Sequence, residues 1–193
     1  MFRRRRADEE TKIAQFVNLD AEVDWATIPR RLRSYVDEAL ESLDRWRRLV
    51  ARQPEGPLRE RLDGWTRRLD GAVHQLVGTA VRVGEIEQIL SALDPERAAE
   101  EYKAAKRKES EGTVPPEMAA LEARFLSVQR MMNAVGDAEE RLRVLDARIG
   151  AVVAQGAELT VVGNDEAAER MDTDLDGLVG DLESLRAALG ELG

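Results

Sequence analysis

The feature that most constrains this chain is an apolar row between residues 58 and 93, in which the spacing alternates between four and three residues without a break. That alternation keeps side chains on one face of an α-helix and is typical of helices that pack along a seam. The row consists of Leu58, Leu62, Trp65, Leu69, Ala72, Leu76, Thr79, Val83, Ile86, Leu90 and Leu93. Further apolar residues between positions 69 and 89 widen it, so we expect this helix at the centre of a bundle.

Three more rows of the same kind lie elsewhere in the chain. The first runs from Leu32 to Val50 and the last from Met171 to Leu192. The remaining row comprises Leu121, Phe125, Val128, Met132, Val135, Ala138, Leu142, Leu145, Ile149 and Val152, with one irregular three-three step near Gly136. A step of that kind locally overwinds a coiled coil.

Together the rows predict an all-α fold, an antiparallel helical bundle or coiled-coil hairpin. Two long helices, about 57–110 and 116–155, are expected to be flanked by two shorter ones, about 29–52 and 164–192. Short turns between them favour antiparallel neighbours. Because a helix rises about 1.5 Å per residue, the long pair must extend past the short pair. The segment around 84–125 should therefore project as a hairpin.

The same segmentation predicts the domain organisation. Residues 1–7 are expected to form a basic, disordered N-terminus, residues 8–19 a short amphipathic helix, and residues 20–193 a single helical bundle domain. Pro95 is compatible with either a kink or a new helix N-terminus, because proline lacks an N–H but suits a first helical turn.

One stretch has the composition of a β-strand. Residues 156–163 read GAELTVVG, and a single short strand has no partner with which to form a sheet. We expect a loop with an extended centre before the last helix.

Composition excludes several classes of chemistry. The chain has no cysteine and a single histidine, which excludes disulfides, thiolate catalysis and multi-histidine metal centres within one chain. No glycine-rich phosphate loop or nucleophile elbow occurs. We therefore expect a non-enzymatic protein without a small-molecule substrate. No apolar stretch approaches the length of a membrane span, so we expect a cytoplasmic location.

The charge is unevenly distributed along the chain. Of the formal net charge of −9, most belongs to residues 157–193, which hold ten acidic residues and two arginines. Proteins that bind nucleic acids present a basic stripe, and this chain has none. We expect an acidic C-terminus and no nucleic-acid partner.

The acidic region contains one metal-like pattern. Residues 172–183 fit the spacing D-x-D-x-D-G-x5-E, and this segment resembles the EF-hand calcium loop over those twelve residues. The resemblance implies calcium ligands at Asp172, Asp174, Asp176, the carbonyl of Leu178, and Glu183. The alternative is a plain acidic helix, because Leu175, Leu178, Leu182 and Leu185 share one stripe only if the chain stays helical.

The N-terminus offers a second candidate contact. Basic and apolar residues combine there, namely Phe2, Arg3, Arg4, Arg5, Arg6, Ile13, Phe16 and Val17. A helix this short is unstable alone, so its apolar strip must dock on the body of the protein, on a partner or on an anionic membrane surface. Asp8, Glu9 and Glu10 weaken the attraction to anionic lipid and favour docking on the body.

These patterns predict a helical interaction or scaffold protein that acts through coiled-coil contacts with a protein partner or with itself. A peripheral membrane scaffold that uses the basic N-terminus is the alternative. Its architecture is similar to that of phage-shock-type remodelling proteins, at the level of the fold only. A calcium-responsive module is the further alternative.

Overall fold

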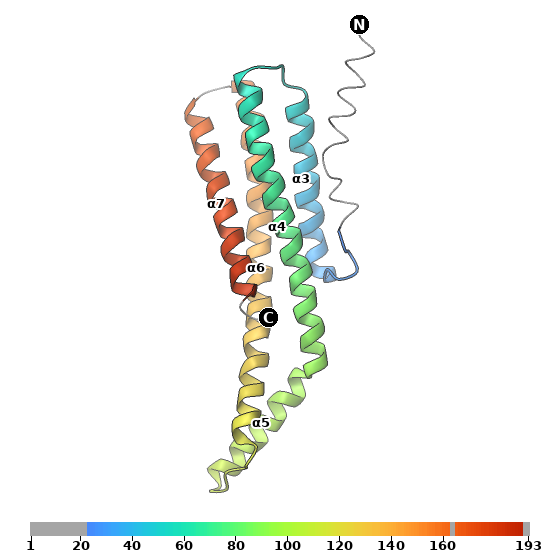
Figure 1. Ribbon diagram of the computed structural model, residues 1–193, viewed down its shortest axis with the longest axis vertical. Coiled ribbons are helices and arrows are strands. Elements are labelled where there is room, and N and C mark those ends of the chain that lie inside the picture. Colours follow the sequence, from blue (N-terminus) through green and yellow to red (C-terminus); the bar gives the residue numbers. More distant parts are fainter. Residues whose placement is uncertain (1–22, 163–164, 191–193) are drawn as a thin grey trace.

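The computed structural model describes residues 23–162 and 165–190. Within them lie a 3-10 turn η1 (Arg30–Leu32) and the helices α3 (Arg33–Ala51), α4 (Pro57–Leu93), α5 (Pro95–Ser110), α6 (Met118–Val162) and α7 (Asp165–Gly190). The predicted all-α bundle is confirmed (Figure 1). In the described part of the chain, no helix combines the length and apolarity needed to cross a membrane.

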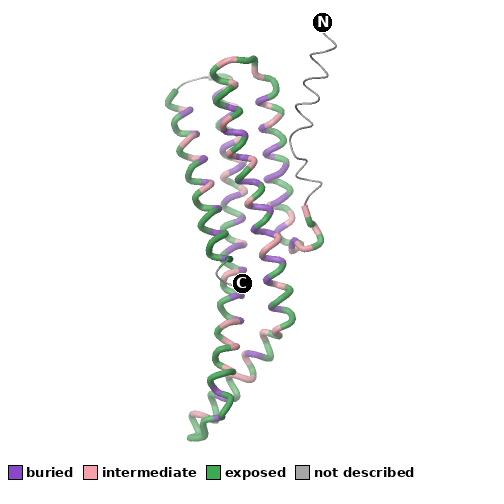
Figure 2. Tube along the Cα trace, in the orientation of Figure 1, coloured by how far each residue is buried: buried purple, intermediate pink, exposed green. Residues whose placement is uncertain are grey.

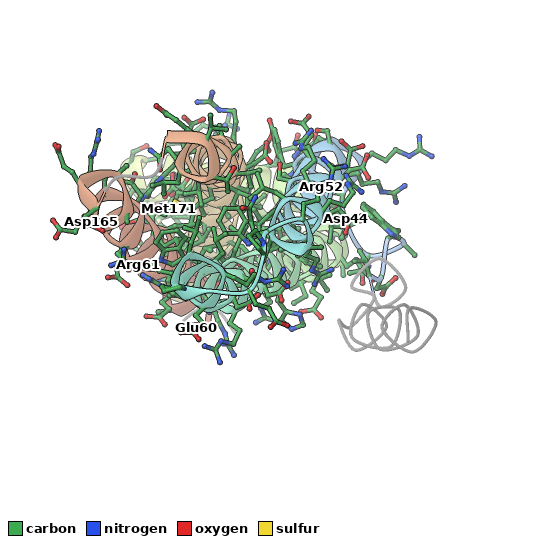
Figure 3. All side chains as sticks on the ribbon, turned by 90° about the horizontal axis from the view of Figure 1, so that it is seen from above. Asp44, Arg52, Glu60, Arg61, Asp165 and Met171 are labelled. Carbon is green, nitrogen blue, oxygen red and sulfur yellow. The ribbon has the colours of Figure 1, made fainter. Side chains whose placement is uncertain are left out.

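The body is built around α4 and α6. These two helices contact each other, and each also contacts α3 and α7. Their apolar rows meet in one core, in which Leu69, Leu76, Ile149 and Leu175 are fully buried. Figure 3 shows the bundle from above, with Met171 pointing inward while Arg61 and Asp165 lie on the outside. The seams of the sequence therefore form the core, and the charges lie on the surface.

The long first helix is broken at Asp94. This residue adopts a left-handed conformation with φ 51°, which ends α4, and its side chain accepts a hydrogen bond from the N–H of Arg97 at the start of α5. Arg124 donates to the carbonyl of Leu93 at 2.8 Å and to Glu101 at 2.8 Å, which ties the break to α6. Pro95 thus begins a new helix, and the expected single helix over 57–110 is corrected to α4 and α5.

The expected loop at residues 156–163 was wrong, because α6 remains helical through Val162. Leu159 lies seven residues after Val152 and is 4% exposed, so the apolar row continues through this stretch. Burial along the seam outweighs the β-propensity of the local sequence. The helix consequently ends about two turns later than the predicted 155.

The register predicted for α6 also needs a correction. Met131 is 8% exposed, whereas Met132 is 52% exposed. Val128, Met131 and Val135 then continue the regular spacing toward Leu159, and the irregular step moves from Gly136 to the stretch between Phe125 and Met131. That stretch lies where α6 leaves the four-helix body and pairs with α5.

Beyond the body, the structure continues as a narrow arm, which we define as residues 88–135. Figure 1 shows the end of α4, α5 and the start of α6 extending past the ends of α3 and α7. Burial is sparse there (Figure 2), and α5 buries only Ala98 and Ala105. Tyr102 stacks on Phe125 with ring centroids 4.8 Å apart, which joins α5 to α6.

Candidate functional site

The segment with the calcium-loop spacing is a helix. Residues 172–183 lie inside α7, and Leu175, Leu178 and Leu182 are fully buried along one stripe. On a helix, residues two apart point about 200° away from each other, so the alternating acids cannot converge on one ion. Among the described residues, no group of three side chains is placed to hold a metal.

The five predicted ligand positions diverge around α7. Asp172 accepts hydrogen bonds from Trp65 Nε1 and Arg68 on α4, both at 2.8 Å. Asp176 pairs with the same arginine, and Asp174 accepts from Gln155 on α6 at 3.0 Å. The Leu178 side chain is in the core, and Glu183 is exposed. Of the two alternatives for this segment, the structure therefore shows the helix, and its acids attach α7 to its two neighbours.

Sequence reasoning missed the polar contacts that lock the tryptophans. Trp46 Nε1 donates to Thr66 Oγ1 at 2.8 Å in the core between α3 and α4. Thr66 in turn donates to the carbonyl of Leu62 at 2.8 Å. A buried indole N–H needs an acceptor. A tryptophan in an apolar row was therefore the available sign that a polar side chain must lie beside it in the fold.

The N-terminal candidates lie outside the described residues. Phe2, Arg3, Arg4, Arg5, Arg6, Ile13, Phe16 and Val17 all belong to residues 1–22. Membrane contact through this segment stays a prediction.

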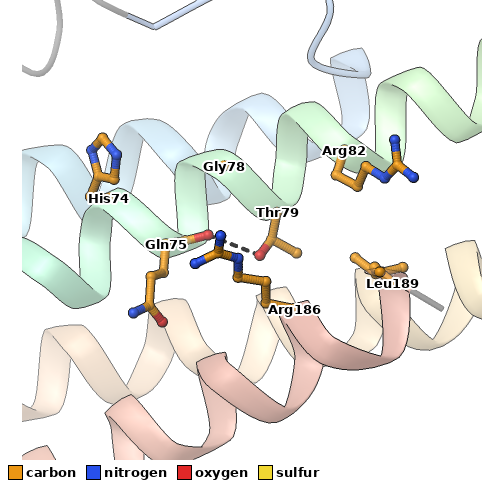
Figure 4. A pocket seen from close by; sticks show the side chains of 8 residues that line it. His74, Gln75, Gly78, Thr79, Arg82, Arg186 and Leu189 are labelled. Atoms are coloured by element: carbon orange, nitrogen blue, oxygen red, sulfur yellow. Dashed lines mark hydrogen bonds between the residues drawn. The ribbon is translucent and has the colours of Figure 1, made fainter. Parts of the chain in front are cut away.

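The surface shared by α4 and α7 is a further candidate site. Two hollows open on it, of about 460 and 510 Å³. The smaller lies near the end of α7 and is lined by His74, Gln75, Gly78, Thr79, Arg82, Arg186, Leu189 and Gly190 (Figure 4). The larger lies near its start and is lined by Arg61, Gly64, Trp65, Arg67, Arg68 and Asp172. We call this surface the α4–α7 face.

Positive groups dominate these linings. Asp172 is the only carboxylate that lines either hollow, and it is already bonded to Trp65 and Arg68. In the smaller hollow, Gln75 Oε1 is buried without a hydrogen-bond partner in the described structure.

One titratable pair lies elsewhere, between α3 and α6. Burial and, after it, the nearby Glu38 together raise the pKa of Asp146 to about 6, while Arg45 acts in the opposite direction. The ordinary value is 3.8, so the folded state binds this proton more tightly than the unfolded chain. The Asp146 carboxylate therefore destabilises the fold when it is ionised, and that cost disappears as the pH falls through about 6 toward 4.

Replacing Asp146 by asparagine should thus stabilise the protein at pH 7.5 by up to about 1 kcal/mol, a value reduced for partial solvent screening. At pH 4 the advantage should vanish. Urea midpoints at both pH values measure it. Glu140→Gln is the control of opposite sign, because a hydrogen bond from Arg143 lowers the pKa of Glu140. An equal gain from Asp146→Asn at both pH values would contradict the assignment.

Compared with known protein families, curated proteins and solved structures, the chain has no significant match.

Proposed function

We propose that this chain is a non-enzymatic helical scaffold that binds protein partners, including copies of itself, through coiled-coil contacts. The observation that carries the proposal is the arm. It leaves the four-helix body with little core of its own and ends in a turn between α5 and α6. Ordering such a hairpin costs chain entropy that its own contacts offset only in part. A partner helix supplies the missing burial.

Exposed apolar side chains support this role for the arm. Ile89, Val114, Leu126 and Met132 are 47%, 66%, 43% and 52% exposed. These four account for most of the exposed large apolar residues in the described chain, and only Leu58, Val144 and Val161 lie elsewhere. Exposed apolar side chains gathered on one projecting element are typical of a protein contact.

The experiment is light scattering of the full chain over a concentration series. We expect the mass to rise with concentration. The double variant Leu126→Glu/Met132→Glu should lower that mass, because it places charges on the arm at positions already open to water. Val144→Glu is the matched control: Val144 is 46% exposed and also lies on α6, but in the body. A monomer at every concentration would refute self-association.

A further inference from the structure

Three glycines follow one another at seven-residue intervals on the outer surface of α4. They are Gly64, Gly71 and Gly78. A glycine inside a helix costs about 1 kcal/mol relative to alanine. A Cβ atom at any of the three would meet no atom within 4 Å. No packing within the described chain therefore requires glycine here, whereas a second helix backbone approaching closely would require it.

An arginine and a histidine alternate with these glycines. Arg67 and His74 each follow a glycine by three residues and are exposed. The only carboxylate between residues 64 and 84 is Asp70, which forms an ion pair with Arg47 of α3 at 2.6 Å. We call Gly64, Arg67, Gly71, His74 and Gly78 the α4 row. It combines small residues with the positive charge of Arg67.

A matching row with the opposite charge lies on the outside of α7. It has the same alternation of four and three residues and consists of Glu169, Thr173, Asp176, Gly180, Glu183 and Ala187. All six are exposed, and a Cβ atom at Gly180 would meet nothing within 4 Å. Acids recur every seven residues, and small residues fill the positions between them. We call this set the α7 row.

The hollows of the α4–α7 face place a further polar atom beside the α4 row. Gly64 lines one hollow and Gly78 the other. In the hollow of Gly78, the buried Gln75 Oε1 lacks a donor among the described residues. The dashed line at Gln75 in Figure 4 is a different bond, from Thr79 Oγ1 to the main-chain carbonyl of Gln75. A buried acceptor left unpaired is costly.

We propose that a second copy of this chain docks on the α4–α7 face, with the α4 row of each copy against the α7 row of the other. This inference rests on the proposed function and names one of its partners. The two rows lie on neighbouring helices of one face, so a two-fold axis satisfies both contacts at once. Arg67 then faces a carboxylate of the α7 row, in which Asp176 is already paired with Arg68 of its own copy. The small residues allow the helices to approach closely.

The test compares leucine variants at glycines where an added Cβ atom would meet no other atom within 4 Å in the single chain. Gly71→Leu and Gly180→Leu should weaken the dimer at least tenfold by light scattering, because the side chain holds the helices apart. Gly136→Leu on α6 is the matched control, since a Cβ there also meets nothing within 4 Å. All three should retain the helical circular dichroism of the wild type, because glycine is the poorer helix former.

Charge provides an independent readout. Association through this face should weaken as salt rises toward 1 M, since salt screens exposed pairs, and Arg67→Glu should weaken it at low salt. If the wild type associates but Gly71→Leu associates equally, the docking surface is wrong and the proposed function stands. If the wild type is monomeric throughout, both this docking surface and self-association are refuted. If the mass of the Leu126→Glu/Met132→Glu variant falls only to that of a dimer, the result would support both the contact through the arm and the contact through the α4–α7 face.

Discussion

Replacing Gly156 by alanine is expected to lower the free energy of unfolding by about 2–3 kcal/mol, the upper part of the range for overpacking a core. The added Cβ atom would lie 1.9 Å from Cζ3 of Trp46, far inside van der Waals contact. The indole cannot move away easily, because it is fully buried and its Nε1 is bonded to Thr66. Urea denaturation followed by circular dichroism measures the change.

The sign makes this prediction sharp, because alanine ordinarily stabilises a helix relative to glycine by about 1 kcal/mol. Gly150→Ala lies on the same helix and meets no atom within 4 Å, so it should show that gain. Combining Gly156→Ala with Trp46→Leu should cost less than the sum of the two single changes, because the smaller side chain makes room. Equal stabilisation by both alanines would contradict the packing.

Gly84→Ala is expected to have a comparable effect, about 3 kcal/mol, through the backbone. The new Cβ atom would lie 1.9 Å from the carbonyl oxygen of Thr27 and 3.2 Å from Cδ of Pro29. Residues 23–32 cross α4 at this point, held by buried Ile28 and Leu32. Arg31 adds pairs to Glu87 at 2.5 Å and to Glu139 at 2.6 Å. The whole segment must lift to admit the methyl group.

Lifting this segment should also expose it to protease. Trypsin is expected to cleave after Arg30 or Arg31 faster in the Gly84→Ala variant than in the wild type, under conditions where the bundle is still folded. Gly136→Ala serves as the control, because open space surrounds that glycine. Unchanged cleavage together with unchanged stability would show that the contact with Thr27 is not tight in solution.

The buried apolar rows of α4 and α7 could be predicted from the sequence because each keeps the alternating four-three spacing over many turns of the helix. The predicted register was wrong where two neighbouring positions fit that spacing nearly equally well. Met131 and Met132 are equally apolar, and only the position of α6 against its partners buries the first and exposes the second. Residues 156–162 contain strand-forming residues, and only the continuing core along α6 keeps them helical.

The candidate site was less predictable than the fold. The alternation of Asp172, Asp174 and Asp176 is identical in a calcium loop and in an acidic helix. Contacts with Trp65, Arg68 and Gln155 distinguish the helix from the loop. These residues lie on other helices, more than fifteen positions away in the sequence. The glycines of α4 were visible in the sequence, but their open surroundings were not.

The sequence by itself determined that this protein is a bundle of amphipathic helices without cysteine or multi-histidine chemistry, because helical periodicity and composition are local properties of the chain. Only the tertiary structure decided which glycines are sites of close contact and which face open space. Gly84 and Gly156 meet other segments, whereas Gly64, Gly71 and Gly78 meet none. That difference depends on the distance between segments remote in sequence, and no local pattern encodes it.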